Sequence, residues 1–334
     1  MAKKKHKDKK TKEVTPEKSQ PIGSILRSRD SVAITRALSG HKIEGVEYAD
    51  SNYIGEELVV TANAMGGTLP CWIFRPNEAM DQKKTVVYLP GSGFQNHMDE
   101  MERRVASHFH KTFQCRIVVL RYPAGSFHKH PESYNAICFT LNYLLNNHPE
   151  VKKSKIAFVG DSSGGLLALL ICLHHLKMQI RLPISQLILF APAVDAKAML
   201  NLIKSKDEKE LNPDFAANSI KACLPQGMGA DSLLFSPMAY DLETFAKLPP
   251  IFLEYGTSDL MCETLDNFAE KIKTAGRQDR IIKKEGMPHI KLYNHICEWL
   301  QEGEIVKFVD TNFEKARLFE DHERFLLMPV VFSV

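Results

Sequence analysis

The sequence predicts an α/β fold in which a mostly parallel sheet of about eight strands carries helices on both faces. Three observations support this prediction. Short apolar segments rich in β-branched residues recur along the chain and are bounded by turn residues. Most of these segments are separated by stretches long enough to form helices. The chain has 334 residues, of which 44% are hydrophobic and 25% charged, so it can bury a large core.

A basic N-terminal segment, residues 1–20, is predicted to form a disordered tail. Residues 1–18 hold eight lysines and three acidic residues, so the net charge of +3 comes from this segment. We expect a solvated extension without a specific nucleic-acid target; the alternative is weak contact with anionic membranes through the lysines. The segment lacks the apolar core of a secretory signal, and no apolar run reaches about 18 residues. We therefore expect a cytoplasmic protein without a membrane span.

The next elements in the chain are helices and a β-hairpin. Residues 21–50 place apolar side chains at roughly helical spacing before Gly40, which predicts N-terminal helices. Residues 56–63 and 68–76 have the composition of two strands separated by a Gly-Gly pair, which predicts an antiparallel hairpin. We expect this hairpin to open the sheet.

Six further predicted strands are continuously apolar, which is typical of parallel strands buried on both faces. They are residues 84–90, 115–123, 155–160, 186–192, 250–256 and 280–285. Helix-length segments such as 98–112 and 131–147 separate most of them. Residues 196–235 contain no clear strand, and we expect a helical insertion that forms a cap together with residues 21–50. The main domain is then 51–334.

The segment IAFVGDSSGG at 156–165 carries a specific chemical signal. It contains a G-x-S-x-G pattern centred on Ser162, between a predicted strand and a predicted apolar helix. Small flanking residues permit a sharp strand-to-helix turn, from which the serine hydroxyl projects above the sheet as a nucleophile. The alternatives are a simple helix cap and the G-D-S-G-G pattern of trypsin-like proteases. The extra serine and the strand–helix context argue against the protease pattern.

A serine nucleophile needs a base, and the base needs an acid that orients it. Asp259 follows the predicted strand 250–256, and His289 follows the predicted strand 280–285. Taken singly, Asp259 and His289 can each be interpreted as an ordinary turn residue. Together they follow Ser162 in the order Ser, Asp, His at the carboxyl ends of successive strands, which predicts a catalytic triad.

The tetrahedral intermediate of acyl transfer needs backbone N–H donors for its oxyanion. One donor is expected from Ser163, the residue after the nucleophile. Others are expected from the glycine-rich loop Pro90-Gly91-Ser92-Gly93, which follows the predicted strand 84–90. An ordinary strand-ending turn is the alternative interpretation of this loop.

Four motifs together resemble the hormone-sensitive-lipase-like family of α/β-hydrolase carboxylesterases. They are PGSG at 90–93, GDSSGG at 160–165, GTSD at 256–259 and GMPH at 286–289, against the family's H-G-G-G, G-D-S-A-G-G, G-x-x-D and G-M-P-H. The resemblance extends over about residues 50–300 and implies the α/β-hydrolase fold with a helical cap.

The resemblance also implies a role for six residues. The nucleophile is Ser162, the acid is Asp259, the base is His289, and the oxyanion amides are those of Ser92, Gly93 and Ser163. Pro90 stands where the family has histidine, and Ser92 replaces a glycine. Backbone amides still suffice there, because serine keeps its N–H.

The predicted function is a serine carboxylic-ester hydrolase of esterase, lipase or deacetylase type that acts on small to medium acyl esters. No metal or organic cofactor is expected, because the histidine pairs at 108–110 and 128–130 lack a well-spaced set of further ligands. The alternatives are a non-catalytic or weakly active ligand-binding protein on the same fold, and a membrane-associated effector. The seven scattered cysteines indicate free thiols in a reducing compartment. The sequence leaves the oligomeric state open.

Overall fold

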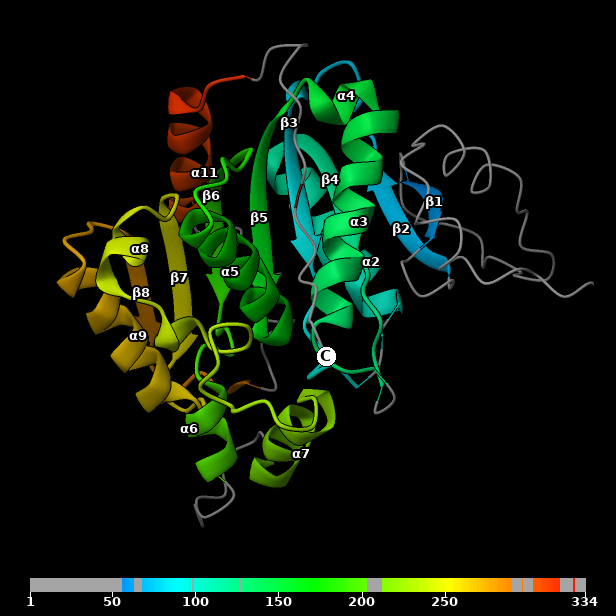
Figure 1. Cartoon of the computed structure of the whole chain (residues 1–334). Helices are drawn as coiled ribbons and strands as arrows, with labels where there is room; N and C mark the ends of the chain where they lie inside the picture. The colour runs from blue at the N-terminus through cyan, green and yellow to red at the C-terminus, as the bar shows by residue number, and fades with distance from the viewer. Residues whose placement is uncertain are drawn as a thin grey trace, which may run out of the picture.

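A computed structural model describes the chain at residues 56–62, 68–95, 97, 99–125, 128–202, 212–289, 296, 303–318 and 327 (Figure 1). The predicted tail at 1–20 and the predicted helices at 21–50 lie outside the described residues. No helix in the described ranges is both long enough and apolar enough to cross a membrane.

The described strands form one eight-stranded sheet in the order β1-β2-β4-β3-β5-β6-β7-β8. Strands β3 to β8 pair in parallel, whereas β2 pairs antiparallel with both β1 and β4. The predicted hairpin and the mostly parallel sheet are confirmed. The strands are β1 (Glu56–Ala62), β2 (Thr68–Phe74), β3 (Asp81–Leu89), β4 (Cys115–Leu120), β5 (Lys155–Asp161), β6 (Ile184–Phe190), β7 (Ile251–Gly256) and β8 (Arg280–Lys284).

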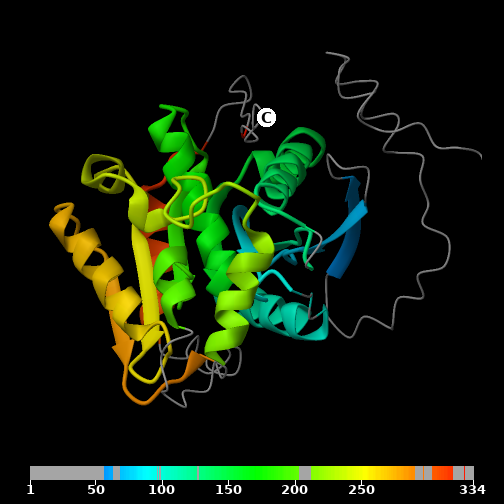
Figure 2. The same ribbon diagram turned by 60° about the horizontal axis from the view of Figure 1, so that its bottom comes forward.

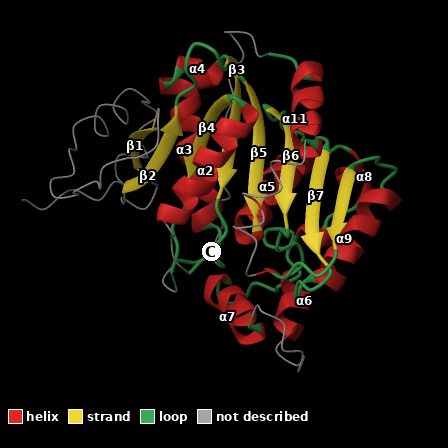
Figure 3. Cartoon of the chain, turned by 180° about the vertical axis from the view of Figure 1, so that it is seen from behind, coloured by secondary structure: helices red, strands yellow, loops and turns green. Residues whose placement is uncertain are grey.

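Helices cover both faces of the sheet, which explains why the buried parts of its central strands are apolar on both sides. Helices α2 and α11 pack against each other and against one face, whereas α3 and α5 lie in front of the sheet in Figure 1 and behind it in Figure 3. Helix α9 packs on β7, with α8 beside it. These helices are α2 (Asp99–Phe113), α3 (Glu132–Asn147), α4 (Pro149–Lys152), α5 (Ser162–Lys177), α8 (Leu242–Ala246), α9 (Cys262–Thr274) and α11 (Glu304–Lys315).

Two helices lie beyond the carboxyl ends of the parallel strands, α6 (Ala196–Asn201) and α7 (Pro213–Cys223) (Figures 1 and 2). Both begin with a side-chain cap: Asp195 accepts from the amide of Ala198 at 3.0 Å, and Asn212 accepts from the amide of Asp214 at 2.8 Å. Both fall inside the interval 196–235 that the sequence predicts to be a helical insertion.

Helix α11 is not among the elements that the sequence analysis predicts. It buries Ile305, Val309 and Phe313, which recur every four residues and therefore share one face. Lys84 of β3 donates to Asp310 at 3.0 Å, and Gln186 of β6 donates to the carbonyl of Val309 at 3.1 Å. These contacts hold the helix at the end of the sheet opposite to α6 and α7, as Figure 1 shows.

Candidate active site

Ser162 lies at the turn between β5 and α5, in a backbone conformation that serine rarely adopts. Its φ is +49°, in the left-handed region. The carbonyl of Ser162 accepts a hydrogen bond of 3.0 Å from the amide of Ala193, which follows β6. The strained turn is thus held by a neighbouring strand and directs the serine hydroxyl away from the sheet.

Gly164 permits the close packing that this turn requires. A Cβ atom at Gly164 would lie 1.9 Å from the carbonyl oxygen of Leu89, at the end of β3. Such a contact is impossible, so any larger residue would push the start of α5 away from the sheet. The second glycine of the G-x-S-x-G pattern is therefore explained by the close approach of α5 to β3.

Three predicted site residues from three different strands meet above the sheet. His289, after β8, has its Nε2 atom 3.1 Å from the Oγ of Ser162. Its Nδ1 atom lies 2.8 Å from an oxygen of Asp259, which follows β7. A carboxylate oxygen only accepts, so Nδ1 carries the proton and Nε2 is free to accept the proton of Ser162. Asp259 is fully buried, and its other oxygen accepts from the amide of Met261 at 2.8 Å.

Two opposing effects act on the pKa of His289, its burial and the nearby negative charges. Burial by itself lowers the pKa of His289, but the charge and hydrogen bond of Asp259 outweigh this effect, and the pKa is raised above its ordinary value of 6.5. The negative charge of Asp161 contributes in the same direction. The surroundings of His289 therefore stabilise the protonated imidazole.

The loop that carries His289 crosses β7 at Gly256. A Cβ atom at Gly256 would lie 1.8 Å from the carbonyl oxygen of Met287. The loop therefore depends on a residue without a side chain at the end of β7, and Gly256 sets the distance between the His289 loop and the Asp259 turn.

The loop after β3 is anchored by Asp161, the last residue of β5. Asp161 is buried, and its carboxylate accepts from the amide of Gly91 at 3.0 Å and from the hydroxyl of Tyr88 at 2.9 Å. Further support comes from Tyr122, whose hydroxyl donates to the carbonyl of Pro90 at 2.5 Å. The loop is thus held directly by Asp161 and Tyr122, and Tyr88 of β3 supports the carboxylate of Asp161.

The amides of Ser92 and Gly93 point toward Ser163, as the prediction of a shared oxyanion site requires. Both nevertheless donate to an atom of the protein itself, the Oγ of Ser163, at 3.0 Å and 3.1 Å. The sequence analysis assigns Ser163 a role through its amide alone, so the contact made by its side chain is an additional finding.

The sequence model of the family described as alpha/beta hydrolase fold matches residues 86–292, more than half of the chain. The chain belongs to this family. It is the family of hormone-sensitive-lipase-like esterases, so the resemblance drawn from the four motifs is confirmed.

Two fungal relatives of this α/β hydrolase are named esterases. One, from Fusarium pseudograminearum (strain CS3096), is 25% identical over 160 residues, which cover 47% of this chain and 49% of the relative. The other, from Gibberella moniliformis (strain M3125 / FGSC 7600), is 27% identical over 153 residues, which cover 45% and 48%. The chain thus spans about half the length of the curated relatives it matches.

Solved structures of esterases share the fold. Carboxyl esterase 2 from the mycorrhizal fungus Tuber melanosporum superposes with a TM-score of 0.68 at 16% identity, covering 88% of this chain and 96% of the esterase. A hyperthermophilic esterase from the archaeon Pyrobaculum calidifontis gives a TM-score of 0.65 at 21% identity, covering 78% and 85%. At sequence identities this low, the structural similarity shows a shared fold and no more.

Several supporting residues of this α/β hydrolase were missed by reasoning from the sequence. Asp161 stands inside the quoted motif, and only the structure shows that its carboxylate holds Gly91. Tyr122 lies in the predicted strand 115–123, just beyond the observed end of β4, and its hydroxyl reaches the carbonyl of Pro90. Polar residues at neighbouring strand ends are a signal that could have identified both side chains.

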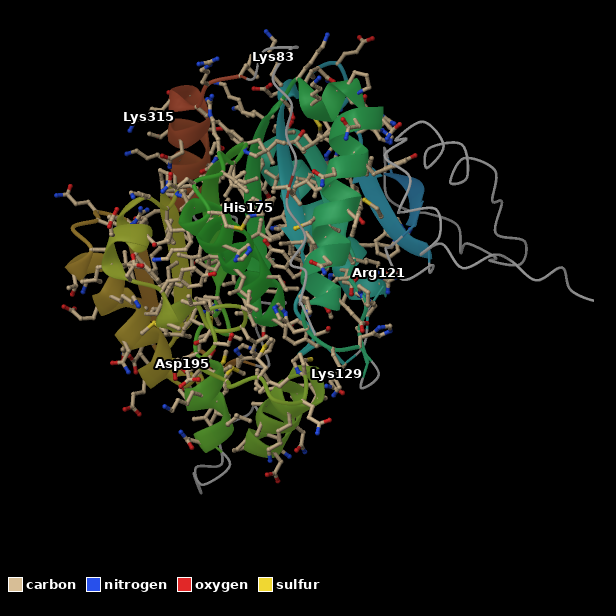
Figure 4. All side chains as sticks on the ribbon, viewed as in Figure 1. Lys83, Arg121, Lys129, His175, Asp195 and Lys315 are labelled. Carbon is tan, nitrogen blue, oxygen red and sulfur yellow. The ribbon has the colours of Figure 1, made fainter. Side chains whose placement is uncertain are left out.

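Helix α7 of the α/β hydrolase lies over the loop after β3. A Cβ atom at Gly93 would lie 2.9 Å from the Oγ of Ser219 and 3.0 Å from the ring of Phe215, both on α7. Lys129 donates to the carbonyl of Ala222 near the end of this helix, and Figure 4 shows Lys129 at that end of the molecule. The helix is thereby tied to the segment that follows β4.

One groove and the side chain of His110 lie apart from this site. A groove of about 950 Å³ runs between α11 and the starts of β7 and β8, at the opposite end of the sheet. Within the described ranges, no group of three or more His, Cys, Asp or Glu side chains is placed to hold a metal ion. His110, in one of the two histidine pairs, directs Nδ1 to the carbonyl of Cys115 at 2.8 Å.

Proposed function

We propose that this α/β hydrolase is a serine carboxylic-ester hydrolase that acts on small to medium acyl esters. The observation that carries the proposal is the chain of contacts from Ser162 Oγ to His289 Nε2 at 3.1 Å and from His289 Nδ1 to Asp259 at 2.8 Å. The names of the fungal relatives and the family support the choice of an ester as substrate.

In the proposed acylation step, the Oγ of Ser162 forms a bond to the ester carbonyl carbon while its proton moves to Nε2 of His289. Asp259 keeps the imidazole in the required tautomer and stabilises its protonated form. Collapse of the tetrahedral intermediate breaks the bond to the alcohol, which takes the proton from His289. Water then repeats the sequence on the acyl-enzyme and releases the acid.

The amides of Ser92, Gly93 and Ser163 are proposed to stabilise the oxyanion, each contributing about 3 kcal/mol when well aimed. Their loop is rigid because Asp161 holds the amide of Gly91 and Tyr122 holds the carbonyl of Pro90. Pro90 can therefore replace the family's histidine, because other side chains fix the loop.

The segment 196–235 is proposed to act as the cap, with α7 forming the wall of the substrate site next to Gly93. Helices α6 and α7 pack against each other beyond the strand ends, and Phe215 projects toward the loop after β3. Figure 4 places Asp195, the residue before α6, at this same end. Acyl groups of modest length are expected because α7 lies close to the oxyanion loop.

The test is hydrolysis of p-nitrophenyl esters of increasing acyl length by the full chain. The expected result is measurable turnover that the Ser162→Ala variant lacks. Ser185→Ala is the matched control, because Ser185 lies near the start of β6, at the end of the strands far from Ser162, and donates to the carbonyl of Ile156 at 2.8 Å. Activity on no ester, or equal rates for wild type and Ser162→Ala, would instead support a non-catalytic ligand-binding protein.

A further inference from the structure

The side chain of Ser163 is hydrogen bonded to the donors that the proposed mechanism reserves for the substrate. The amides of Ser92 and Gly93 direct their N–H groups at Ser163 Oγ, at 3.0 Å and 3.1 Å. Each of these amides has one hydrogen to donate, so neither can serve an oxyanion at full strength while this contact persists. Ser163 is 2% exposed, so water does not compete readily for its hydroxyl.

The direction of the remaining hydrogen bond follows from Tyr122. The hydroxyl of Tyr122 donates its single proton to the carbonyl of Pro90 at 2.5 Å, because a carbonyl oxygen only accepts. The contact of 3.2 Å between the hydroxyls of Tyr122 and Ser163 then leaves Ser163 as the donor. Ser163 Oγ thus accepts two N–H groups and donates to Tyr122, which satisfies the hydroxyl in a buried setting.

We infer that the Ser163 hydroxyl occupies the oxyanion position in the free protein and that the reacting ester must displace it. The inference rests on the proposed function, since it concerns the same amides. Rotation about the Cα–Cβ bond of Ser163 is the smallest change that frees both amides, and it leaves the Ser163 amide in place. A developing oxyanion bears charge and accepts more strongly than a neutral hydroxyl, which favours the exchange as the reaction proceeds.

The consequence is a site that is slowed by its own side chain. A displaced Ser163 hydroxyl loses its three hydrogen-bond partners. The free energy of these lost bonds adds to the barrier of the acylation reaction in every catalytic cycle. An alanine at this position keeps the amide, removes the competitor and leaves Ser92 and Gly93 free to bind the oxyanion. The opposite role, in which the Ser163 hydroxyl donates to the oxyanion, predicts that the same substitution slows the reaction.

The first measurement tests occupancy without relying on hydrolysis. Amide proton chemical shifts of Ser92 and Gly93 are compared by NMR between the full-length wild type and Ser163→Ala. Loss of the acceptor is expected to move both amide protons upfield and to speed their hydrogen exchange. Gly91 is the internal control, because its amide is bonded to Asp161 at 3.0 Å and should not move. Unchanged Ser92 and Gly93 resonances would overturn the inference, whatever the activity.

The second measurement tests competition with the substrate. For p-nitrophenyl acetate, Ser163→Ala is expected to raise kcat/KM by about tenfold, because the net strength of one neutral hydrogen bond corresponds to a factor of that order. Ser185→Ala should equal the wild type. An equal or lower kcat/KM for Ser163→Ala would overturn the inference. If neither wild type nor Ser163→Ala cleaved any ester, the proposed function would fail, while the amide shifts would still decide whether Ser163 occupies the site.

Discussion

The left-handed backbone at Ser162 places local strain in the candidate site. A residue with a Cβ atom pays about 1–2 kcal/mol in this region, and glycine avoids the penalty. The turn persists because the amide of Ala193 bonds the Ser162 carbonyl at 3.0 Å and because α5 is almost entirely buried. Strain at Ser162 is thus maintained by packing around it.

The strain predicts an order of stability among variants at this position. Ser162→Gly should be more stable than Ser162→Ala by about 0.5–1 kcal/mol, because relief at φ +49° exceeds the added freedom of glycine in the unfolded chain. Urea denaturation of the two inactive variants measures the difference. A glycine variant less stable than the alanine variant would contradict strain at Ser162.

The pH dependence of activity should report on His289. The imidazole acts as a base only when neutral, and its pKa is raised above 6.5. We therefore expect kcat/KM to rise with pH along a limb whose midpoint lies above 6.5, measured with an ester whose own hydrolysis is subtracted.

The Asp259→Asn variant is the control for this assignment. Without the carboxylate, burial dominates and lowers the pKa of His289, so the limb should move to lower pH. The plateau should fall by about 10⁴-fold, because the imidazole loses its required tautomer. A limb that stays in place would show that Asp259 does not set the pKa.

At the residue scale, the sequence predicts the residues that chemistry requires in a fixed order. Ser162, Asp259 and His289 could be selected because each follows a strand and the order is that of a triad. The contact between Ser163 Oγ and the loop amides could not be predicted from the sequence, because it depends on one side-chain rotamer. The contacts by which Tyr122 and Asp161 hold the loop depend likewise on how adjacent strand ends pack.

At the element scale, the crossing of the His289 loop over β7 leaves no space for a side chain at the end of the strand. Gly256→Ala places a Cβ atom 1.8 Å from the carbonyl oxygen of Met287, so the loop must move. A displacement of about 1 Å at a reacting group costs on the order of 10²-fold, which is the expected loss in kcat/KM.

The matched control for this loop is Gly276→Ala, after α9. Gly276 has φ +77° and no atom within 4 Å of a Cβ atom. We expect it to lose about 1 kcal/mol of stability and to keep full kcat/KM. If the two variants lost the same stability and the same activity, Gly256 would have no special part in positioning His289.

The position of α7 predicts selectivity for acyl length. Phe215 is 43% exposed and lies beside Gly93, so Phe215→Ala should raise the kcat/KM of longer p-nitrophenyl esters relative to the acetate. Leu242→Ala on α8, a residue of equal exposure outside the site, should leave this ratio unchanged. An unchanged ratio for Phe215→Ala would remove α7 from the substrate site.

Element prediction succeeded where periodicity and chemistry agreed. Most of the parallel strands contain a continuous apolar run, so their positions follow from the sequence to within a few residues. Helix α11 was missed although Ile305, Val309 and Phe313 form a buried stripe, because that segment lies beyond the family resemblance. The placement of α7 over Gly93 depends on tertiary contacts of Lys129 and Phe215, which no local pattern contains.

At the scale of the whole molecule, the order of the sheet explains how distant residues converge. Ser162 follows β5, Asp259 follows β7 and His289 follows β8, and all three strands run parallel. Their carboxyl ends therefore open on one edge, where α6 and α7 also lie. The fold class was predictable because apolar strands alternate with helix-length segments, which indicates a parallel sheet, and such a sheet brings the residues that follow its strands to one end.

The central claim is that Ser162 is a nucleophile activated by His289, and covalent trapping tests it most directly. An alkyl fluorophosphonate is incubated with the full chain, and the adduct is located by intact mass and peptide mapping. We predict one adduct per chain on Ser162, none on Ser162→Ala, and labelling at least about 100-fold slower for His289→Ala. A folded wild-type protein that stays unlabelled, or that carries the adduct on another residue, would contradict the claim.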